Sequence, residues 1–157
     1  MLLREYAIED QDHRIMLDVG IPNKDSKIGI VLLHGAYVNR KSLSRRNSGF
    51  AGFIAQELKA TTLAPVFFGE TKNKNKNSST LDNMRNIVSN TVDHLKDEYA
   101  IEKVICFGHS MGGILLGDIV HNAEAIDAMA MYGSLTNIDC QSLHLVRIIQ
   151  FLDNIRG

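Results

Sequence analysis

A chain of 157 residues is long enough for one globular domain, and its net charge of -1 includes no basic block that would suit a nucleic acid or an anionic membrane. Its apolar fraction of 45% and charged fraction of 22% exclude a disordered protein. The sequence has no run of about 18 apolar residues and no apolar leader, so we expect neither a membrane span nor a signal peptide. Two cysteines do not suggest a disulfide framework, and we expect a cytoplasmic location.

The first part of the chain predicts three strands. Residues 2–9 and 13–21 form a hairpin, because apolar and polar residues alternate in the second segment. Residues 27–33 are a continuous apolar run, typical of a strand buried on both faces. The run ends at His34, which we expect to be a buried structural residue. It is followed by Gly35, which frees the backbone to turn an N–H toward the neighbouring strand end.

A helix, a strand and a polar loop follow. The helix is predicted over 42–58, the next strand over 61–67, and the loop over 71–79, which is wholly polar. Apolar residues at helical spacing define the face of this helix that we expect to be buried. They are Phe50, Phe53, Ile54 and Leu58.

A second helix is predicted over about 80–99. Ser79 with Asp82 three residues later resembles a capping box at its start. His94 lies one residue off the apolar face, and we expect it to be in solvent. The apolar residues that keep helical period, and that we expect to be buried, are Leu81, Met84, Val88, Val92, Leu95 and Tyr99.

The stretch that carries the chemistry follows this helix. The apolar run 104–107 breaks at Gly108, and residues 108–112 read Gly-His-Ser-Met-Gly, which fits G-x-S-x-G. That pattern is a strand that turns sharply into a helix with Ser110 at the apex. The strained turn needs small flanking residues, which are Gly108 and Gly112. The helix aims its unpaired N–H groups at the same place, where an oxyanion needs donors. The alternative is a serine in a Gly-rich turn that only closes a βαβ unit.

The remaining chain predicts a helix to about 124, a strand over 126–132 and an amphipathic helix over 145–155. Strands and helices alternate after the hairpin. We therefore expect an α/β fold: a mainly parallel sheet of six strands, with helices on both faces and an N-terminal antiparallel hairpin. The serine strand should lie near the middle of the sheet and 126–132 at an edge. That exposed C-terminal edge and the half-covered final helix predict self-association.

Three of these features together resemble the α/β-hydrolase family, most closely its small esterases, lipases and serine aminopeptidases. They are residues 32–35 after the first parallel strand, the turn at 65–70, and the serine turn, in the family's order and spacing. The resemblance implies one α/β-hydrolase domain over 1–157, with Ser110 as the nucleophile. It also implies that the N–H groups of Ala36 and Met111 form the oxyanion hole. No metal-ligand spacing occurs among the histidines and cysteines, and we expect no cofactor.

The chain departs from the family after the serine. Family members continue through two more strands, which carry the catalytic acid and then the histidine. Too few residues follow Ser110 for both strands, so we expect a domain without its C-terminal third. Asp139 and His144 are weak candidates for the acid and base. His109 and His121 are wrongly placed, one beside the serine and the other well along its helix.

Two functions follow from this interpretation. The first is a serine hydrolase that cleaves a small-molecule ester, thioester or amide through an acyl-enzyme on Ser110. The second is a catalytically inactive, truncated remnant of the fold that binds a small molecule or a partner protein. We expect these 157 residues alone to be a very weak hydrolase or none, because a serine without its base is a poor nucleophile.

Overall fold

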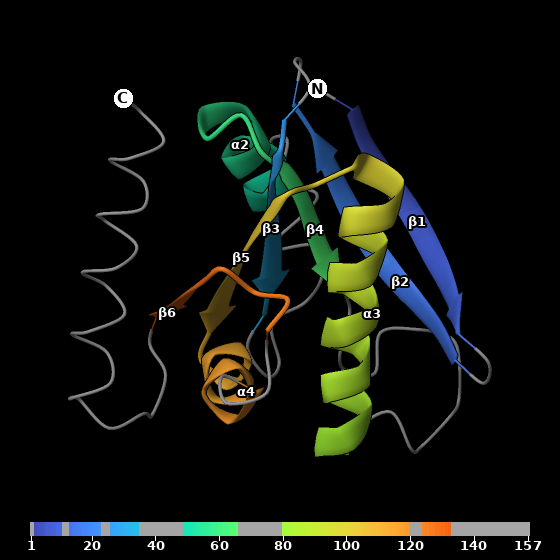
Figure 1. Cartoon of the computed structure of the whole chain (residues 1–157), viewed down its shortest axis with the longest axis vertical. Coiled ribbons are helices and arrows are strands. Elements are labelled where there is room, and N and C mark those ends of the chain that lie inside the picture. Colours follow the sequence, from blue (N-terminus) through green and yellow to red (C-terminus); the bar gives the residue numbers. More distant parts are fainter. Residues whose placement is uncertain are drawn as a thin grey trace.

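The sheet is the central layer of the molecule. The computed structural model describes residues 2–10, 13–22, 26–34, 49–65, 80–119 and 124–132. Six described strands form one sheet in the order β1-β2-β4-β3-β5-β6 (Figure 1). Their bounds are β1 Leu2–Asp10, β2 His13–Ile21, β3 Ile28–Leu33, β4 Thr61–Pro65, β5 Lys103–His109 and β6 Ala128–Tyr132.

The sheet is antiparallel at one end and parallel at the other. β1 pairs with β2 and β2 with β4 in antiparallel register, so the N-terminal hairpin is joined to the sheet through β4. The pairs β3–β4, β3–β5 and β5–β6 are parallel. The carboxyl ends of β3 and β5 therefore lie at the same edge of the sheet, beside α4 (Figure 1).

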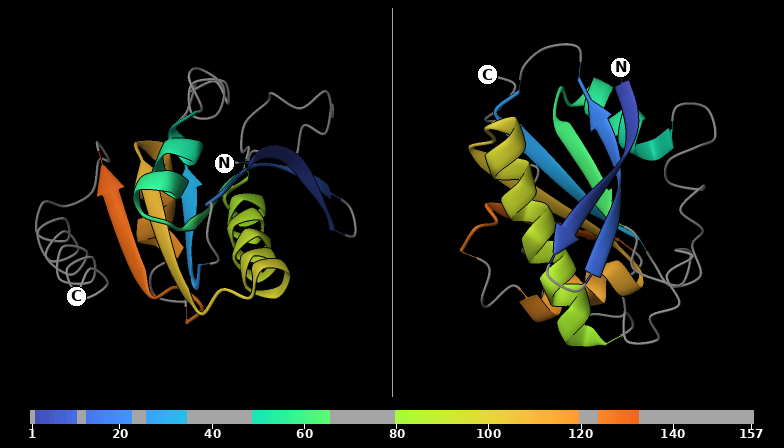
Figure 2. Two further views of the ribbon diagram at one scale, coloured as in Figure 1. Left: turned by 90° about the horizontal axis from the view of Figure 1, so that it is seen from above. Right: turned by 90° about the vertical axis from the view of Figure 1, so that its right-hand side faces the viewer.

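Helices cover both faces, as the alternation of elements predicts (Figure 2). They are α2 (Gly49–Glu57), α3 (Leu81–Tyr99) and α4 (Met111–Ile119). Alternate residues of β3 enter two separate cores: Ile30 and Leu32 pack with α2, and Val31 and Leu33 pack with α3 and α4. β3 is thus buried on both faces, as its continuous apolar run indicates.

The serine strand does not lie at the middle of the described sheet. β5 is fifth in the order of six, directly beside β6, which is at the edge as expected. The hairpin explains the difference, because β1 and β2 both add to the far side through β4. β4 and β3 occupy the two central positions of the described sheet instead.

The buried face predicted for the helix over 42–58, which is α2 in the structure, is wrong at Phe53, whereas Ile54 and Leu58 are partly buried against the core. Phe53 is 57% exposed, whereas Ala51 and Ala55 are fully buried. The reason lies in β2: a Cβ on Gly20 would be 2.8 Å from the carbonyl oxygen of Ala51. The helix approaches the strand so closely that only small residues fit between them. Ile54 packs at the margin of this core, and the expected helical residues 42–48 lie outside the described part of the chain.

The start of α3 is one residue later than predicted. Thr80, not Ser79, is the N-cap, and its hydroxyl oxygen accepts a hydrogen bond from the Asn83 N–H at 3.3 Å. Leu81 is 44% exposed, because the first turn of the helix projects beyond the core. The predicted core positions Met84, Val88, Val92 and Leu95 are confirmed, and Tyr99 is only partly buried. The buried residues of this helix are Met84, Ile87, Val88, Thr91, Val92 and Leu95.

His94 is half-buried rather than in solvent. Its ring meets Tyr99 edge-on, with ring centroids 6.0 Å apart. Burial lowers the pKa of His94, against the opposing charges of Glu98 and Asp97. The partly buried side of α3 is therefore wider than the stripe of apolar residues in the sequence indicates. None of the helices in the described ranges offers an apolar stretch long enough to cross a membrane.

Candidate functional site

Ser110 is the single residue between β5 and α4. Its φ angle is 52°, in the left-handed region that residues other than glycine rarely occupy. Its N–H donates to the carbonyl oxygen of Tyr132 at 2.9 Å. Its own carbonyl oxygen accepts from the N–H groups of Gly113 and Ile114 at 3.0 and 3.2 Å. The turn is thus held from the β6 side and from the first turn of α4, which keeps the strained conformation in place.

Two glycines let the chain pass through this turn. A Cβ on Gly108 would lie 2.6 Å from the carbonyl oxygen of Gly112 and from the nitrogen of Gly113. A Cβ on Gly112 would overlap the carbonyl oxygen of Leu33, the last residue of β3. The turn at Ser110 therefore packs directly on the end of the neighbouring strand.

The N-terminus of α4 supplies hydrogen-bond donors beside the serine. Met111 is the first residue of α4, and the first N–H groups of a helix have no intrahelical partner. The second expected donor, Ala36, lies outside the described residues, as do Gly35, Asp139 and His144. The described chain leaves β3 at His34, which is 4% exposed, next to Leu33 and hence close to the serine turn.

Aromatic and apolar side chains surround this end of β5. The His109 ring stacks on the ring of Tyr132, with centroids 5.8 Å apart and planes 24° apart. Tyr132 is 68% exposed, and Met111 and Ile114 are both more than one-third exposed. Tyr132 was not predicted as a neighbour of the serine turn, because the register that pairs it with His109 is a tertiary feature. Its only signal was its place at the end of the last apolar run.

The described residues offer no metal site, since no three of their His, Cys, Asp or Glu side chains cluster as metal ligands. Cys106 lies two residues before Gly108 and is completely buried. Burial raises the pKa of its thiol to about 12. The thiol is therefore protonated near neutral pH and behaves as a small apolar residue.

The strand order, the helices on both faces and the strand-to-helix turn are those of the α/β-hydrolase fold, which the chain shares with solved hydrolase structures. Residues 57–131 match the family described as alpha/beta hydrolase of unknown function (DUF915). This segment runs from the end of α2 through the serine turn to β6. No curated protein matches the chain significantly in sequence.

Solved hydrolase structures share the fold at low sequence identity. A thermostable carboxyl esterase from Bacillus coagulans superposes with a TM-score of 0.65 at 15% identity, over 83% of this chain and 44% of the esterase. A dienelactone hydrolase from Anabaena variabilis superposes with a TM-score of 0.57 at 21% identity, over 84% of this chain and 64% of that enzyme. Proline iminopeptidase from Mycobacterium smegmatis superposes with a TM-score of 0.60 at 17% identity, over 83% of this chain and 44% of the peptidase. The chain thus spans between two-fifths and two-thirds of the length of these enzymes.

Proposed function

We propose that the protein is a serine hydrolase that cleaves a carboxylic ester, thioester or amide through an acyl-enzyme on Ser110. One observation carries the proposal: Ser110 occupies the left-handed region, at φ 52°, in the turn from β5 into α4. A serine is held in such a costly conformation only where the surrounding structure enforces it, and such strain gathers at functional sites. The same turn faces helix donors that an oxyanion requires.

The proposed reaction has two halves. The Ser110 oxygen attacks the substrate carbonyl carbon while a histidine takes its proton, and the N–H groups of Met111 and Ala36 hold the oxyanion. Collapse of this intermediate breaks the bond to the leaving group, which takes the proton. Water then attacks the acyl-enzyme in the same way, releasing the acid and restoring the hydroxyl of Ser110. His144 is the downstream histidine to test as the base.

The surroundings of the turn support a small apolar substrate. Met111 and Ile114 expose apolar side chains on the helix that begins directly after the serine. The similar structures include a carboxyl esterase, a dienelactone hydrolase and a proline iminopeptidase by name, which supports the ester and amide classes. We also propose that the protein is cytoplasmic.

The test is covalent labelling with a fluorophosphonate probe, together with turnover of a panel of p-nitrophenyl esters. The chain is compared with Ser110→Ala, and with Ser89→Ala, which removes an exposed serine of α3, as a matched control. We expect slow labelling that Ser110→Ala abolishes and Ser89→Ala leaves unchanged. Equal labelling of all three proteins would overturn the proposal in favour of a non-catalytic binding domain.

The rate of labelling tests the base as well as the nucleophile. Fast, Ser110-dependent labelling and turnover would mean that a base lies within these residues. His144→Ala should then abolish the activity, while His94→Ala, on the flank of α3, should leave it intact. Activity that survives His144→Ala would exclude His144 as the base without affecting the role of Ser110.

A further inference from the structure

Few side chains of α4 are fully buried. The helix has nine residues, and its buried positions are Gly112, Gly113, Leu115 and Leu116. Two of these four are glycines, so the buried side chains of the helix are two neighbouring leucines. Ile119, the last residue of the helix, is partly buried against the same core. A polar contact outside the core would add a further constraint on the direction of the helix.

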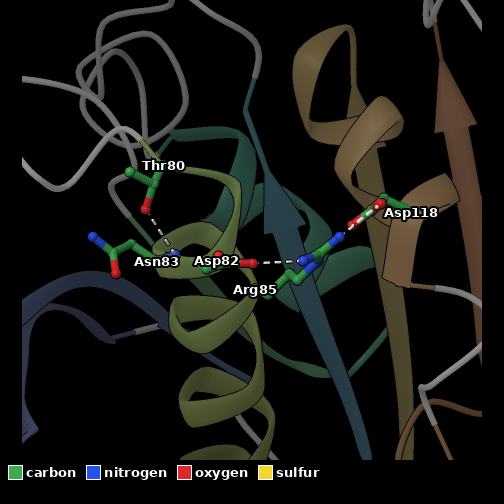
Figure 3. A network of polar contacts seen from close by, with 5 residues as sticks. All are labelled: Thr80, Asp82, Asn83, Arg85 and Asp118. Atoms are coloured by element: carbon green, nitrogen blue, oxygen red, sulfur yellow. Dashed lines mark hydrogen bonds and ion pairs between the residues drawn. The ribbon is translucent and has the colours of Figure 1, made fainter.

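Arg85 of α3 provides such a contact. Its Nε donates to Asp118 Oδ2 at 2.6 Å and its Nη2 to Asp118 Oδ1 at 3.0 Å (Figure 3). Two parallel bonds between a planar guanidinium and a carboxylate restrict both distance and orientation. On the other side, Nη1 donates to Asp82 Oδ1 at 2.6 Å, which holds the guanidinium on its own helix. Asp118 belongs to the last turn of α4, at the end opposite Met111.

The helix that carries Arg85 is firmly seated. α3 buries six residues along its length, and two of them, Met84 and Val88, lie one and three residues from Arg85. Arg85 itself is partly exposed, with 42% of its side chain accessible, and 30% of the Asp118 side chain is accessible. An isolated exposed ion pair adds little stability. A geometric role, which links the last turn of α4 to the firmly seated α3, accounts for this arrangement better.

Both partners are charged across the neutral range. The hydrogen bonds from Arg85 lower the pKa of the Asp118 carboxyl, with the guanidinium charge acting in the same direction. The bonds to Asp118 in turn raise the pKa of Arg85, with a smaller contribution from Asp82. The contact therefore keeps its charge-assisted form near neutral pH.

We propose that the Arg85–Asp118 pair positions α4, and through it aims the first-turn N–H groups of that helix beside Ser110. Both are positioning residues, because they act through the helix and touch no reacting atom. The part of this inference that concerns catalysis rests on the proposed hydrolase function. The mechanical part, that the pair orients α4, does not depend on it.

The test uses Arg85→Met, Asp118→Asn and the double variant. The matched control is Glu102→Gln, which breaks the exposed Lys27–Glu102 ion pair of 3.2 Å before β5, at the other end of that strand from Ser110. The first readout is amide hydrogen exchange by NMR at Gly113 and Ile114, whose N–H groups bond to the Ser110 carbonyl. The second is kcat and KM for Ser110-dependent ester turnover, or the labelling rate where turnover is too slow.

Each single variant should speed exchange of these two amides by up to about fivefold, on the scale of a lost ion pair. The double variant should match the single ones, because either change breaks the same contact. Turnover should fall about tenfold in kcat with KM unchanged, since misaligned donors weaken transition-state binding alone. Glu102→Gln should leave both readouts as in the wild type.

Several outcomes would overturn the proposal. Unchanged exchange at both amides in Arg85→Met and Asp118→Asn would do so, as would an equal effect of Glu102→Gln. If Arg85→Met fails to fold, Arg85→Lys serves instead, because it keeps the charge but cannot form the two parallel hydrogen bonds of the guanidinium. Exchange rates equal to those of the wild type in that variant would contradict the geometric role. If the wild-type chain shows no Ser110-dependent labelling, only the hydrolase proposal is overturned. Amide exchange at Gly113 and Ile114 would still test whether the pair orients α4.

Discussion

Gly112 and Leu33 are in direct backbone contact, since a Cβ on Gly112 would overlap the carbonyl oxygen of Leu33. The contact joins the first turn of α4 to the end of β3, and backbone on both sides leaves nothing that can move aside. Gly112→Ala should therefore lower the free energy of unfolding by about 3 kcal/mol, the upper range of overpacking. Denaturant unfolding measures this, with Asn86→Ala on the exposed face of α3 as the neutral control. A Gly112→Ala protein as stable as the wild type would contradict the close approach.

Backbone strain at Ser110 is expected to reduce the stability of the fold. Ser110 and Ala100 both have left-handed φ angles, 52° and 49°, and Ala100 is the C-cap of α3. Glycine adopts this conformation without a Cβ penalty, so Ser110→Gly and Ala100→Gly should each raise the free energy of unfolding by about 0.5–1 kcal/mol. Thermal or denaturant unfolding measures both changes. Only Ser110→Gly should abolish labelling, and a destabilised Ser110→Gly protein would show that the serine side chain, rather than strain, dominates.

Because of Cys106, the free energy of unfolding should fall as the pH rises in the alkaline range. Its pKa is about 12 in the folded chain because the thiol is buried, and near 9 when it is exposed. The raised pKa means that the stabilisation is complete below about pH 9 and is lost as pH rises from there toward 12, because only the unfolded thiol ionises. We expect a loss of about 1.4 kcal/mol per pH unit in this window.

The measurement is denaturant unfolding between pH 8 and 10 in a Cys140→Ser background, so that one thiol titrates. Cys106→Ala in the same background is the control and should have a flatter profile. In the native protein, the buried thiol should also resist alkylation near neutral pH. Parallel pH profiles for the two proteins would refute the assignment of the alkaline loss to Cys106.

The edge of the sheet predicts self-association. β6 is the last strand of the described sheet, and Tyr132 at its end is 68% exposed. Unpaired strand edges and exposed apolar side chains favour contact with a second chain. Tyr132→Lys should weaken association, and Phe53→Lys, which changes another exposed aromatic residue, on α2, should leave it unchanged. Sedimentation at high concentration measures this, and a clean wild-type monomer would contradict the prediction.

Local periodicity was enough to predict most elements of this chain. The alternation in 13–21, the continuous run in 27–33 and the helical spacing in 81–99 each reflect an environment that a single element imposes on its own residues. The G-x-S-x-G pattern likewise predicted a serine between a strand and a helix, because the strain and its glycines are local. Ser110 lies there, between β5 and α4.

Features that depend on a second element could not be predicted in this way. Gly20 of β2 decides which face of α2 is buried, and no pattern within α2 reveals it. The position of β5 in the sheet depends on where the hairpin attaches, and the Arg85–Asp118 pair joins two helices that local spacing treats as independent. The N-cap is Thr80 rather than Ser79, and local pattern does not resolve a helix end to a single residue.

The pairing of β3 with β5 has a consequence for folding kinetics. The two strands are far apart along the chain, and the Gly112–Leu33 contact can form only after they have met. Such non-local contacts require loop closure first, and they slow the search for the native state. The strained turn at Ser110 should therefore be unformed at the rate-limiting barrier. Relieving its strain with Ser110→Gly would then prolong the lifetime of the folded chain, while a newly made chain would fold no faster.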